Sequence, residues 1–472
     1  MLLVILRILN AHGEGIRRAH FNFCRNFFIA APSAAAAAPP ELSLTLAQAE
    51  SEALSHSPAL KAAQSGLAAA AAQVDAQFAL LVPQISLQAA YQYQTIVPRL
   101  SLAPGLSSFQ FGSHDSYSVG PTVSYTLWDQ GTLLNAWRSQ KALASSQEAQ
   151  RDLVRRQVLL MTRLDYFQVQ LALEQERSLA DSLKLAQAQD QDIESRFRAG
   201  AASRIDSLTA QEQVVERLRD FRAAQVQASA ALRTLFAQTG RNQELDASAP
   251  LDARIANSSP PEISPPTLVV NLEPLGSVEA AFKLAAEAPM DEAYPGLAVY
   301  ARQARAQTLA SRSLSDQLWP RFALLYKSDY MYPNMPLLES VWQNTAGVSA
   351  SVPLFEFGRT RRLAAAQKDL AAASLAQEAA AYDDLARDWR KAKDEYAALS
   401  DIETLDRESV KDTSQIAELR YSSYKSGGST ILDVETADLN ALQAQIGSAQ
   451  TKTQELIQLA TLASLSSAKE TP

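Results

Sequence analysis

The segment closest to a catalytic motif is Ser422-Ser-Tyr-Lys425, whose S-x-x-K spacing places a nucleophilic serine near a lysine base. The later Lys-Ser-Gly element of such enzymes is matched only by Lys425-Ser-Gly427, which contains the same lysine. One lysine cannot fill both positions, and the segment also has the composition of a turn between helices. We therefore predict that the protein is not an enzyme and has no catalytic residue.

The other common reactive groups are equally unpromising. The four histidines, His12, His20, His56 and His114, do not follow the spacing of metal ligands. Neither a phosphate-binding loop nor a dinucleotide fingerprint occurs. The sequence thus predicts no cofactor and no metal.

A turn that occurs twice is more informative. RFRAGAASRIDSLTA (196–210) is nearly repeated as YKSGGSTILDVETA (424–437). Equivalent residues lie 227 positions apart, as in Phe197 and Tyr424 (424 − 197) or Asp206 and Asp433 (433 − 206). A duplicated turn at this distance indicates a duplicated protein.

Each copy of the turn contains helix-ending and helix-starting signals. Gly200 and Gly427, the latter followed by Gly428, supply the left-handed residue that ends a helix. Ser203 with Asp206, and Thr430 with Asp433, fit capping boxes that satisfy free N–H groups at a helix start. We predict that capping is the main role of both aspartates.

The segments around the turns repeat in the same order. A helical pattern ends before Pro83 and again before Pro320, and Gly131 and Gly358 precede the next helical runs. The run from Thr132 to the first turn would span roughly 100 Å as one helix, which a globular domain does not need. We predict helical turns at about 199–203 and 426–430, and strands at about 84–94, 115–128, 321–331 and 345–355.

These patterns divide the chain into five parts. We assign 1–40 to an export signal of atypical form, 41–240 to a first repeat, 241–275 to a linker, 276–465 to a second repeat and 466–472 to a C-terminal tail. The second repeat is predicted to begin with a helical segment from Ser277 to Trp319 that is broken near Pro295.

The first two predicted strands alternate between apolar and polar residues, and the second pair follows from the repeat. In the first, Ile85 and Leu87 alternate with Gln84, Ser86 and Gln88. Strands of about ten residues reach across a bilayer when tilted, with lipid on one side and water on the other. Four strands cannot close a barrel, so this reading requires oligomerisation. A soluble sheet with one buried face is the alternative.

The net charge of −8 is spread along the chain, with basic and acidic residues interleaved. No basic patch containing aromatic residues occurs, and we predict no nucleic-acid partner.

With its elements in this order, the sequence resembles the TolC-like family of outer-membrane efflux proteins, the outer membrane factors of tripartite efflux or type I secretion systems. The resemblance covers about 44–465. Its sharpest parts are SYTLWDQG and SVPLFEFGR at the strand–helix junctions, and FRAGAASRID and YKSGGSTILDV at the turns.

The resemblance implies a mainly α fold with a small transmembrane β part, built from a duplicated helix–β-hairpin–long helix–turn–helix unit. Three copies are expected to form an α-barrel continued by a twelve-stranded β-barrel. The implied location is the outer membrane, with an extension into the periplasm. The implied function is a passive exit duct for drugs or other small molecules. The implied partners are outer-membrane lipid, a periplasmic adaptor (membrane fusion) protein and an inner-membrane transporter of RND, ABC or MFS type.

The resemblance also assigns roles at the turns, which form the periplasmic entrance in the family. Asp206 and Asp433 align with tip aspartates, and Tyr424 aligns with a tyrosine that helps to hold the entrance closed. Two positions depart from the family pattern. Ser429 stands where an arginine can occur and Thr436 where an aspartate can occur, so the gate is expected to use Arg204 or Lys425 instead.

Two other classes remain as alternatives. A soluble periplasmic coiled-coil scaffold without channel activity predicts sustained heptads and no alternating strands. A self-contained porin predicts many more strands and few helices.

Overall fold

The computed structural model describes residues 41–97, 99–100, 109–110, 112–241, 251–255, 268–334 and 337–467. The predicted export signal at 1–40 lies outside the described residues, as does most of the predicted tail. The described residues belong to one compact unit that is mainly helical. None of the helices in this part of the chain combines the length and the apolar character needed to cross a membrane.

The described part of the first repeat contains four helices: α1 (Leu46–His56), α2 (Pro58–Ala79), α3 (Thr132–Arg198) and α4 (Arg204–Thr239). The sequence predicted one helix before the first strand, and this was wrong because the chain breaks between α1 and α2. Ser57 has a non-helical backbone there (φ −56°, ψ 117°), caps α2 through its side chain and precedes Pro58 at the first helical position.

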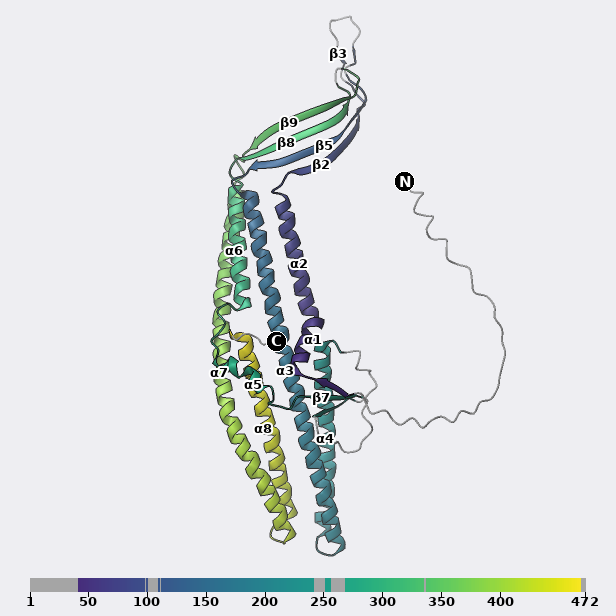
Figure 1. The fold of residues 1–472 in the computed structure, drawn as a ribbon, viewed down its shortest axis with the longest axis vertical. Helices are drawn as coiled ribbons and strands as arrows, with labels where there is room; N and C mark the ends of the chain where they lie inside the picture. The colour runs from purple at the N-terminus through teal and green to yellow at the C-terminus, as the bar shows by residue number, and fades with distance from the viewer. Residues whose placement is uncertain are drawn as a thin grey trace, which may run out of the picture. The chain divides into compact units, whose positions relative to one another are not determined.

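The second repeat follows the same order with α5 (Glu279–Glu287), α6 (Pro295–Asp316), α7 (Arg359–Lys425) and α8 (Ile431–Leu465). The predicted break near Pro295 is confirmed, since α6 begins at that residue. Both α3 and α7 contain 67 residues. Figure 1 shows them running past the stacked shorter helices, with the sheet at one end and the two turns at the other. The predicted duplication is confirmed in the helices.

Four antiparallel strands form the larger sheet: β2 (Gln84–Tyr93), β5 (Asp115–Trp128), β8 (Arg321–Tyr332) and β9 (Val341–Ser351), in the order β2-β5-β8-β9. The prediction of 345–355 for the last strand was wrong by four residues at each end. Val341 and Trp342 pair with the end of β8, and Pro353, which lacks an N–H group, lies just beyond the strand. A two-residue pair, β3 (Arg99–Leu100) with β4 (Phe109–Gln110), lies in the loop between β2 and β5.

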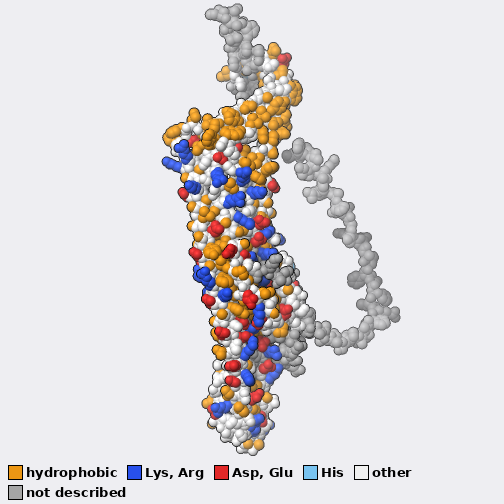
Figure 2. All heavy atoms as spheres, turned by 60° about the vertical axis from the view of Figure 1, so that its left-hand side comes forward, with side chains coloured by type: hydrophobic (Ala, Val, Ile, Leu, Met, Phe, Trp, Pro, Cys, Tyr) orange, Lys and Arg blue, Asp and Glu red, His pale blue; other side chains and the backbone are white. Residues whose placement is uncertain are grey.

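The register of the sheet confirms the predicted faces. Ile85 pairs with Val123, which pairs with Tyr326, so apolar side chains form continuous rows on one face. Ser86 pairs with Thr122 on the other face. Figure 2 shows hydrophobic side chains gathered at the sheet end of the molecule.

The strand–helix junctions use the residues that the sequence singled out. Gly131 (φ 99°) and Gly358 (φ 75°) precede α3 and α7 in a left-handed conformation that glycine adopts without strain. Asp129 caps α3 by accepting hydrogen bonds from the backbone N–H groups of Gly131 (3.0 Å) and Leu133 (2.8 Å). Pro83 and Pro320 directly precede β2 and β8.

A second sheet is absent from the sequence prediction. Three parallel strands, β1 (Glu41–Leu44), β7 (Leu268–Leu272) and β6 (Leu251–Ile255), pair in the order β1-β7-β6. Two of them lie in the segment predicted only as a linker. Parallel pairing joins segments far apart in sequence, so local patterns do not reveal it.

The apolar core lies where β1 and β7 meet the helices α1, α3, α4, α5 and α8. Tyr166, Phe167, Leu232, Phe236 and Leu456 are fully buried there. The Tyr166 hydroxyl donates to the carbonyl oxygen of Leu44 (3.0 Å), so a buried polar group on α3 also fixes β1.

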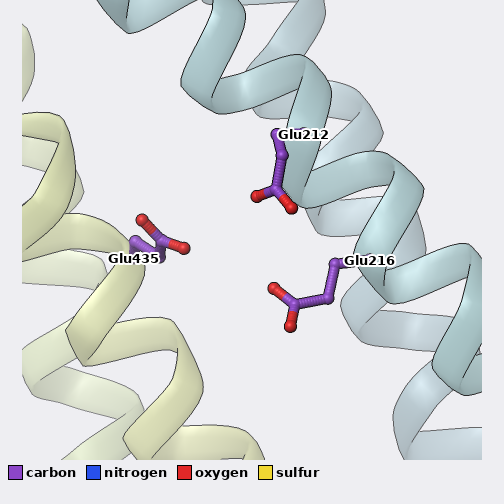
Figure 3. Close-up of side chains that lie close together, drawn as sticks. All are labelled: Glu212, Glu216 and Glu435. Atoms are coloured by element: carbon purple, nitrogen blue, oxygen red, sulfur yellow. The ribbon is translucent and has the colours of Figure 1, made fainter.

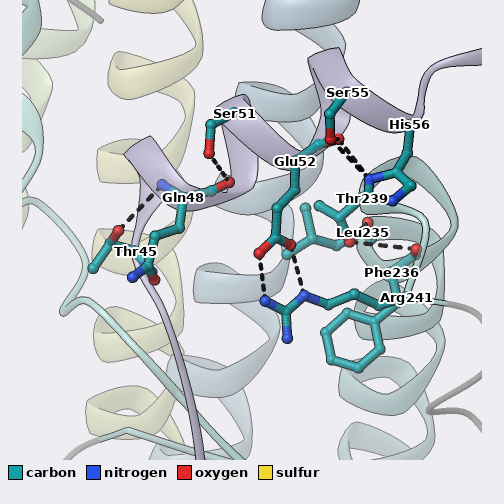
Figure 4. Close-up of polar contacts among 10 residues, drawn as sticks. All are labelled: Thr45, Gln48, Ser51, Glu52, Ser55, His56, Leu235, Phe236, Thr239 and Arg241. Carbon is teal, nitrogen blue, oxygen red and sulfur yellow. Dashed lines mark hydrogen bonds and ion pairs between the residues drawn. The ribbon is translucent and has the colours of Figure 1, made fainter.

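Two ion pairs connect α1 to its neighbours around this core. Arg241, just after α4, donates through Nε to Glu52 of α1 (2.6 Å), as Figure 4 shows. Deeper inside, Arg163 Nε donates to Glu50 Oε1 (2.6 Å), and the guanidinium lies 5.1 Å from the ring centre of Phe282. The side chains of Arg163 and Glu50 are only 4 % and 12 % exposed.

Replacing Glu50 by Ala should lower the free energy of unfolding by about 3–5 kcal/mol, because the change leaves a buried guanidinium without its partner. The control is Asp152→Ala, which breaks an exposed pair with Arg151 on the same helix and should cost only about 0–1 kcal/mol. Urea unfolding of the purified protein in detergent, followed by the helical signal in far-ultraviolet circular dichroism, measures both losses of unfolding free energy. Equal losses would show that the buried pair is no more important than the surface pair.

Candidate functional site

The two helical turns lie at the end of the helices opposite the sheet (Figure 1). The first joins Arg198 at the end of α3 to Arg204 at the start of α4. The second joins Lys425 at the end of α7 to Ile431 at the start of α8. Both turns therefore have the predicted bounds.

The predicted tip glycines behave differently from one another. Gly200 (φ 77°) and Gly427 (φ 80°) are left-handed, as predicted for helix-ending residues. Gly428 does not have a positive φ, and its N–H donates to the carbonyl oxygen of Ser423 (2.9 Å). A side chain at Gly428 would approach the Ser423 hydroxyl to 2.8 Å.

Both predicted capping boxes are confirmed. Asp206 Oδ2 accepts from the Ser203 N–H (3.1 Å), and the Asp206 N–H donates to the Ser203 hydroxyl (3.1 Å). Asp433 Oδ2 accepts from both the N–H (2.9 Å) and the hydroxyl (2.8 Å) of Thr430. These hydrogen bonds from Thr430 lower the pKa of Asp433, so its carboxylate is charged at neutral pH.

A polar network joins the two helical hairpins, α3–α4 and α7–α8, at the end where the turns lie. Asp192 Oδ2 on α3 accepts from the Tyr421 hydroxyl on α7 (2.9 Å) and from Arg196 Nε (3.0 Å). Arg196 also donates to the carbonyl oxygen of Lys425 (3.3 Å). Burial and the bond to Asp192 raise the pKa of Tyr421 to about 12, so its hydroxyl keeps the proton that it donates.

An apolar cluster lies beneath the network. Ile193 and Ala210 of the first hairpin meet Ile431 and Val434 of the second, and Tyr424 packs partly buried against them. Burial raises the pKa of Tyr424, and the charge of Asp206 adds to the effect. Among the described residues no hydrogen bond joins Asp206 to Tyr424.

The two predicted cations have aromatic neighbours. The guanidinium of Arg204 lies 5.6 Å from the ring centre of Phe197 in its own hairpin. The ammonium of Lys425 lies 4.8 Å from the ring centre of Tyr421. Lys425 thus touches the network directly, whereas Arg204 does not.

The two departures from the family pattern have local hydrogen bonds. The Ser429 hydroxyl donates to the carbonyl oxygen of Arg420 (3.1 Å), and the Thr436 hydroxyl to that of Leu432 (2.8 Å).

Sequence reasoning missed Asp192, Arg196 and Tyr421 as a group. Asp192 and Tyr421 lie 229 residues apart, and so do Arg196 and Lys425, whereas the repeat has an offset of 227. Comparing equivalent positions of the two repeats therefore does not pair them. The one sequence signal that could have indicated part of this network was the pair Asp192 and Arg196, an acidic and a basic residue four positions apart on α3.

Further from the turns, three carboxylates gather between α4 and α8. The ligand atoms of Glu212, Glu216 and Glu435 all lie within 4.8 Å of one another, as Figure 3 shows. Arg219 lies 3.4 Å from Glu216 and neutralises part of the charge. The cluster extends the negative charge of the turns along the two helices.

Comparison with known proteins shows which family has this arrangement of helices, strands and turns. The family model described as outer membrane efflux protein matches residues 49–241 and 294–467. A search of curated proteins found no match.

Solved structures share the fold at low identity. VceC, an outer membrane protein of Vibrio cholerae, is 17% identical with a TM-score of 0.71, covering 89% of this chain and 95% of that one. A membrane protein from Pseudomonas aeruginosa is 20% identical (TM-score 0.70, 89% and 93% covered). The Campylobacter jejuni CmeC outer membrane channel is 16% identical (TM-score 0.69, 97% and 96% covered).

The family model covers most of the chain and includes both turns and all four strands of the larger sheet. The chain therefore belongs to the outer membrane efflux protein family, whose members are located in the outer membrane and extend into the periplasm.

Proposed function

We propose that three copies of this chain form a passive exit duct, in which their twelve strands close one barrel in the outer membrane. The observation that carries this proposal is the larger sheet. Its apolar face is open to the surroundings, with Ile85 and Leu87 each 75% exposed. Among the described residues, its end strands, β2 and β9, each pair with only one neighbouring strand. Lipid on the face and neighbouring subunits at both edges satisfy these surfaces together.

The other face of the sheet suits a water-filled passage. It carries Gln, Ser and Thr side chains and an ion pair between Lys327 and Asp329 (2.6 Å). Such a lining passes polar solutes without binding them strongly. The energy for export then comes from an inner-membrane transporter, of RND, ABC or MFS type, joined through a periplasmic adaptor protein. The exposed apolar face disfavours the alternative of a soluble coiled-coil scaffold.

We assign the two turns to the periplasmic entrance of this duct. The network of Asp192, Arg196 and Tyr421 holds the two hairpins of one subunit together and keeps the entrance narrow. Three subunits bring up to six aspartates, Asp206 and Asp433 from each copy, toward the axis. Tyr424 and Lys425 support the closed state through packing around Tyr421.

Replacing Leu87 by Arg tests the location of the sheet. The lipid-facing charge should cost about 2–4 kcal/mol near the bilayer midplane and reduce the amount of trimer in outer-membrane fractions. The control is Gln88→Arg, on the opposite face of β2, which should leave the trimer intact and change its conductance. Val123→Arg and Ser124→Arg form the same pair on β5. Equal tolerance on both faces would refute the proposed barrel.

Replacing Asp433 by Ala should lower cation selectivity in planar-bilayer recordings, because it removes three negative charges from the entrance. The matched variant Asp433→Asn keeps a capping side chain but removes the charge, so it should lower selectivity as well. Since the pKa of Asp433 is lowered, selectivity in the parent should persist to moderately acidic pH and decline as pH falls through that lowered value. If Asp433→Asn selects ions like the parent, the carboxylate is only a helix cap.

Replacing Tyr421 by Phe removes the hydrogen bond to Asp192 and should favour the open entrance. A bond to a charged group contributes about 1.5–3 kcal/mol, so the open state should gain at least tenfold per subunit. The open probability in single-channel recordings measures the change. Tyr424→Phe is the control, because no described residue accepts a hydrogen bond from the Tyr424 hydroxyl. An unchanged open probability in Tyr421→Phe would exclude the network from gating.

A further inference from the structure

A basic groove lies between α3 and α6, near the end of the helices that adjoins the larger sheet. It has a volume of about 760 Å³ and carries five cationic side chains together with the ring of Trp137. The cations are Arg138, Lys141, Arg302, Arg305 and Arg312. Figure 2 shows Lys and Arg side chains on the helices next to the hydrophobic sheet end.

Most of this positive charge is uncompensated. Arg302 lies 3.5 Å from Glu148 and donates to the carbonyl oxygen of Ser145 (2.6 Å). Of the described residues, none places a carboxylate within 4.0 Å of Arg138, Lys141, Arg305 or Arg312. Four like charges in one groove repel one another unless an anion lies between them.

The groove is on the outer side of the helix layer if the chain closes into the proposed trimer. On α3, Ser139 and Ser146 donate to backbone oxygens of α6, whereas Trp137 and Gln147 face α2. With 3.6 residues per turn, the directions toward these two neighbours are about 130° apart on one side and about 230° on the other. In a closed ring of helices the wider side faces outward. Arg138 and Lys141 lie on that wider side.

Helix α6, which forms the other wall of the groove, also turns its cations outward. Ala306 and Ser313 of α6 face α3, whereas Gln307 and Ser311 face α7. The same helical geometry places the wider side of α6 around Arg305 and Arg312. Both walls of the groove therefore point away from the passage.

The position along the helices matches the border of the membrane. Trp137 lies nine residues after the last residue of β5 and packs against Phe78, with the ring centres 6.0 Å apart. Aromatic side chains of this kind mark the interface of outer-membrane barrels. Arg138 and Lys141 follow Trp137 within about one turn, and Lys141 lies 5.4 Å from its ring centre. The cations thus begin where the aromatic side chains end, at the depth of lipid headgroups.

We propose that this groove binds the phosphate groups of anionic phospholipids in the leaflet of the outer membrane that faces the periplasm. Guanidinium groups pair with phosphate oxygens through two parallel hydrogen bonds, and the Trp137 ring lies against the first methylene groups of the lipid. The bound lipid fixes the depth of the barrel in the membrane. The inference rests on the trimer of the proposed function, which determines that the groove faces outward.

The test compares lipid binding by native mass spectrometry of purified trimers in detergent. The parent should bind cardiolipin and phosphatidylglycerol well above phosphatidylcholine of the same chain length. The triple variant Arg138→Gln, Lys141→Gln, Arg312→Gln should bind the two anionic lipids roughly 100-fold more weakly, since each cation near the surface contributes about a factor of five. A control triple variant, Arg222→Gln, Arg390→Gln, Lys411→Gln, removes the same charge elsewhere and should bind like the parent.

Additional variants and measurements distinguish the possible reasons for a negative result. Lys141→Gln alone should weaken binding about fivefold and serves if the triple variant does not assemble. Added inorganic phosphate at millimolar concentration should not displace the lipid. Cation selectivity in planar bilayers should be the same in the triple variant and the parent, because the groove lies outside the passage. Lipid binding by the triple variant equal to that of the parent, an equal loss in the control, displacement by phosphate or altered selectivity would each overturn the inference. Absence of trimers in the parent would instead refute the proposed function.

Discussion

Backbone hydrogen bonding at the edges of the larger sheet constrains the whole molecule. β2 and β9 each leave one row of N–H and C=O groups without a partner in the same sheet. Such groups cannot remain unpaired in lipid, where no water replaces the missing hydrogen bonds. In the proposed closed barrel, the helices that continue from these strands must lie side by side at the spacing that the barrel imposes. This explains why α2, α3, α6 and α7 form a single layer, in which each helix contacts only its neighbours over much of its length.

A single layer of helices has little core, and the contacts between its helices show how it is stabilised. Small side chains predominate there, and several serine hydroxyls donate to backbone oxygens of the adjacent helix. Ser139, Ser146 and Ser313 join α3 and α6 in this way, with donor–acceptor distances of 2.8–2.9 Å. Small residues allow close approach of the backbones, and each hydroxyl satisfies its own donor without a polar cavity. Such contacts suit a wall that is wet on both sides.

The sequence allowed much of this fold to be predicted, because its signals are local. Alternation with a period of two identified the first two strands, the repeat identified the other two, and the prolines and glycines identified the junctions. The duplicated capping boxes at Asp206 and Asp433 located the turns. The sheet of β1, β7 and β6 could not be found in this way, because β1 pairs in parallel with β7 more than two hundred positions away. The break at Ser57 was missed because the apolar pattern continues through it. At the turns, the contact between Asp192 and Tyr421 follows neither the repeat nor any motif, since it depends on how two hairpins pack.

Stability is distributed unevenly, and this bears on how a passive duct can open. Most of the largest buried side chains, the second sheet, and the ion pairs Arg163–Glu50 and Lys452–Glu279 lie where α1, α4, α5 and α8 meet the long helices. Near the turns the apolar contact shrinks to a few residues around Ile193 and Val434. Elements with few buried contacts separate at lower free-energy cost than the core of the same chain. The hairpins can therefore move apart while the middle of the molecule stays fixed. If the turns form the entrance, as we propose, a small number of polar bonds is sufficient to hold it closed, and equally small changes in their surroundings are sufficient to release it.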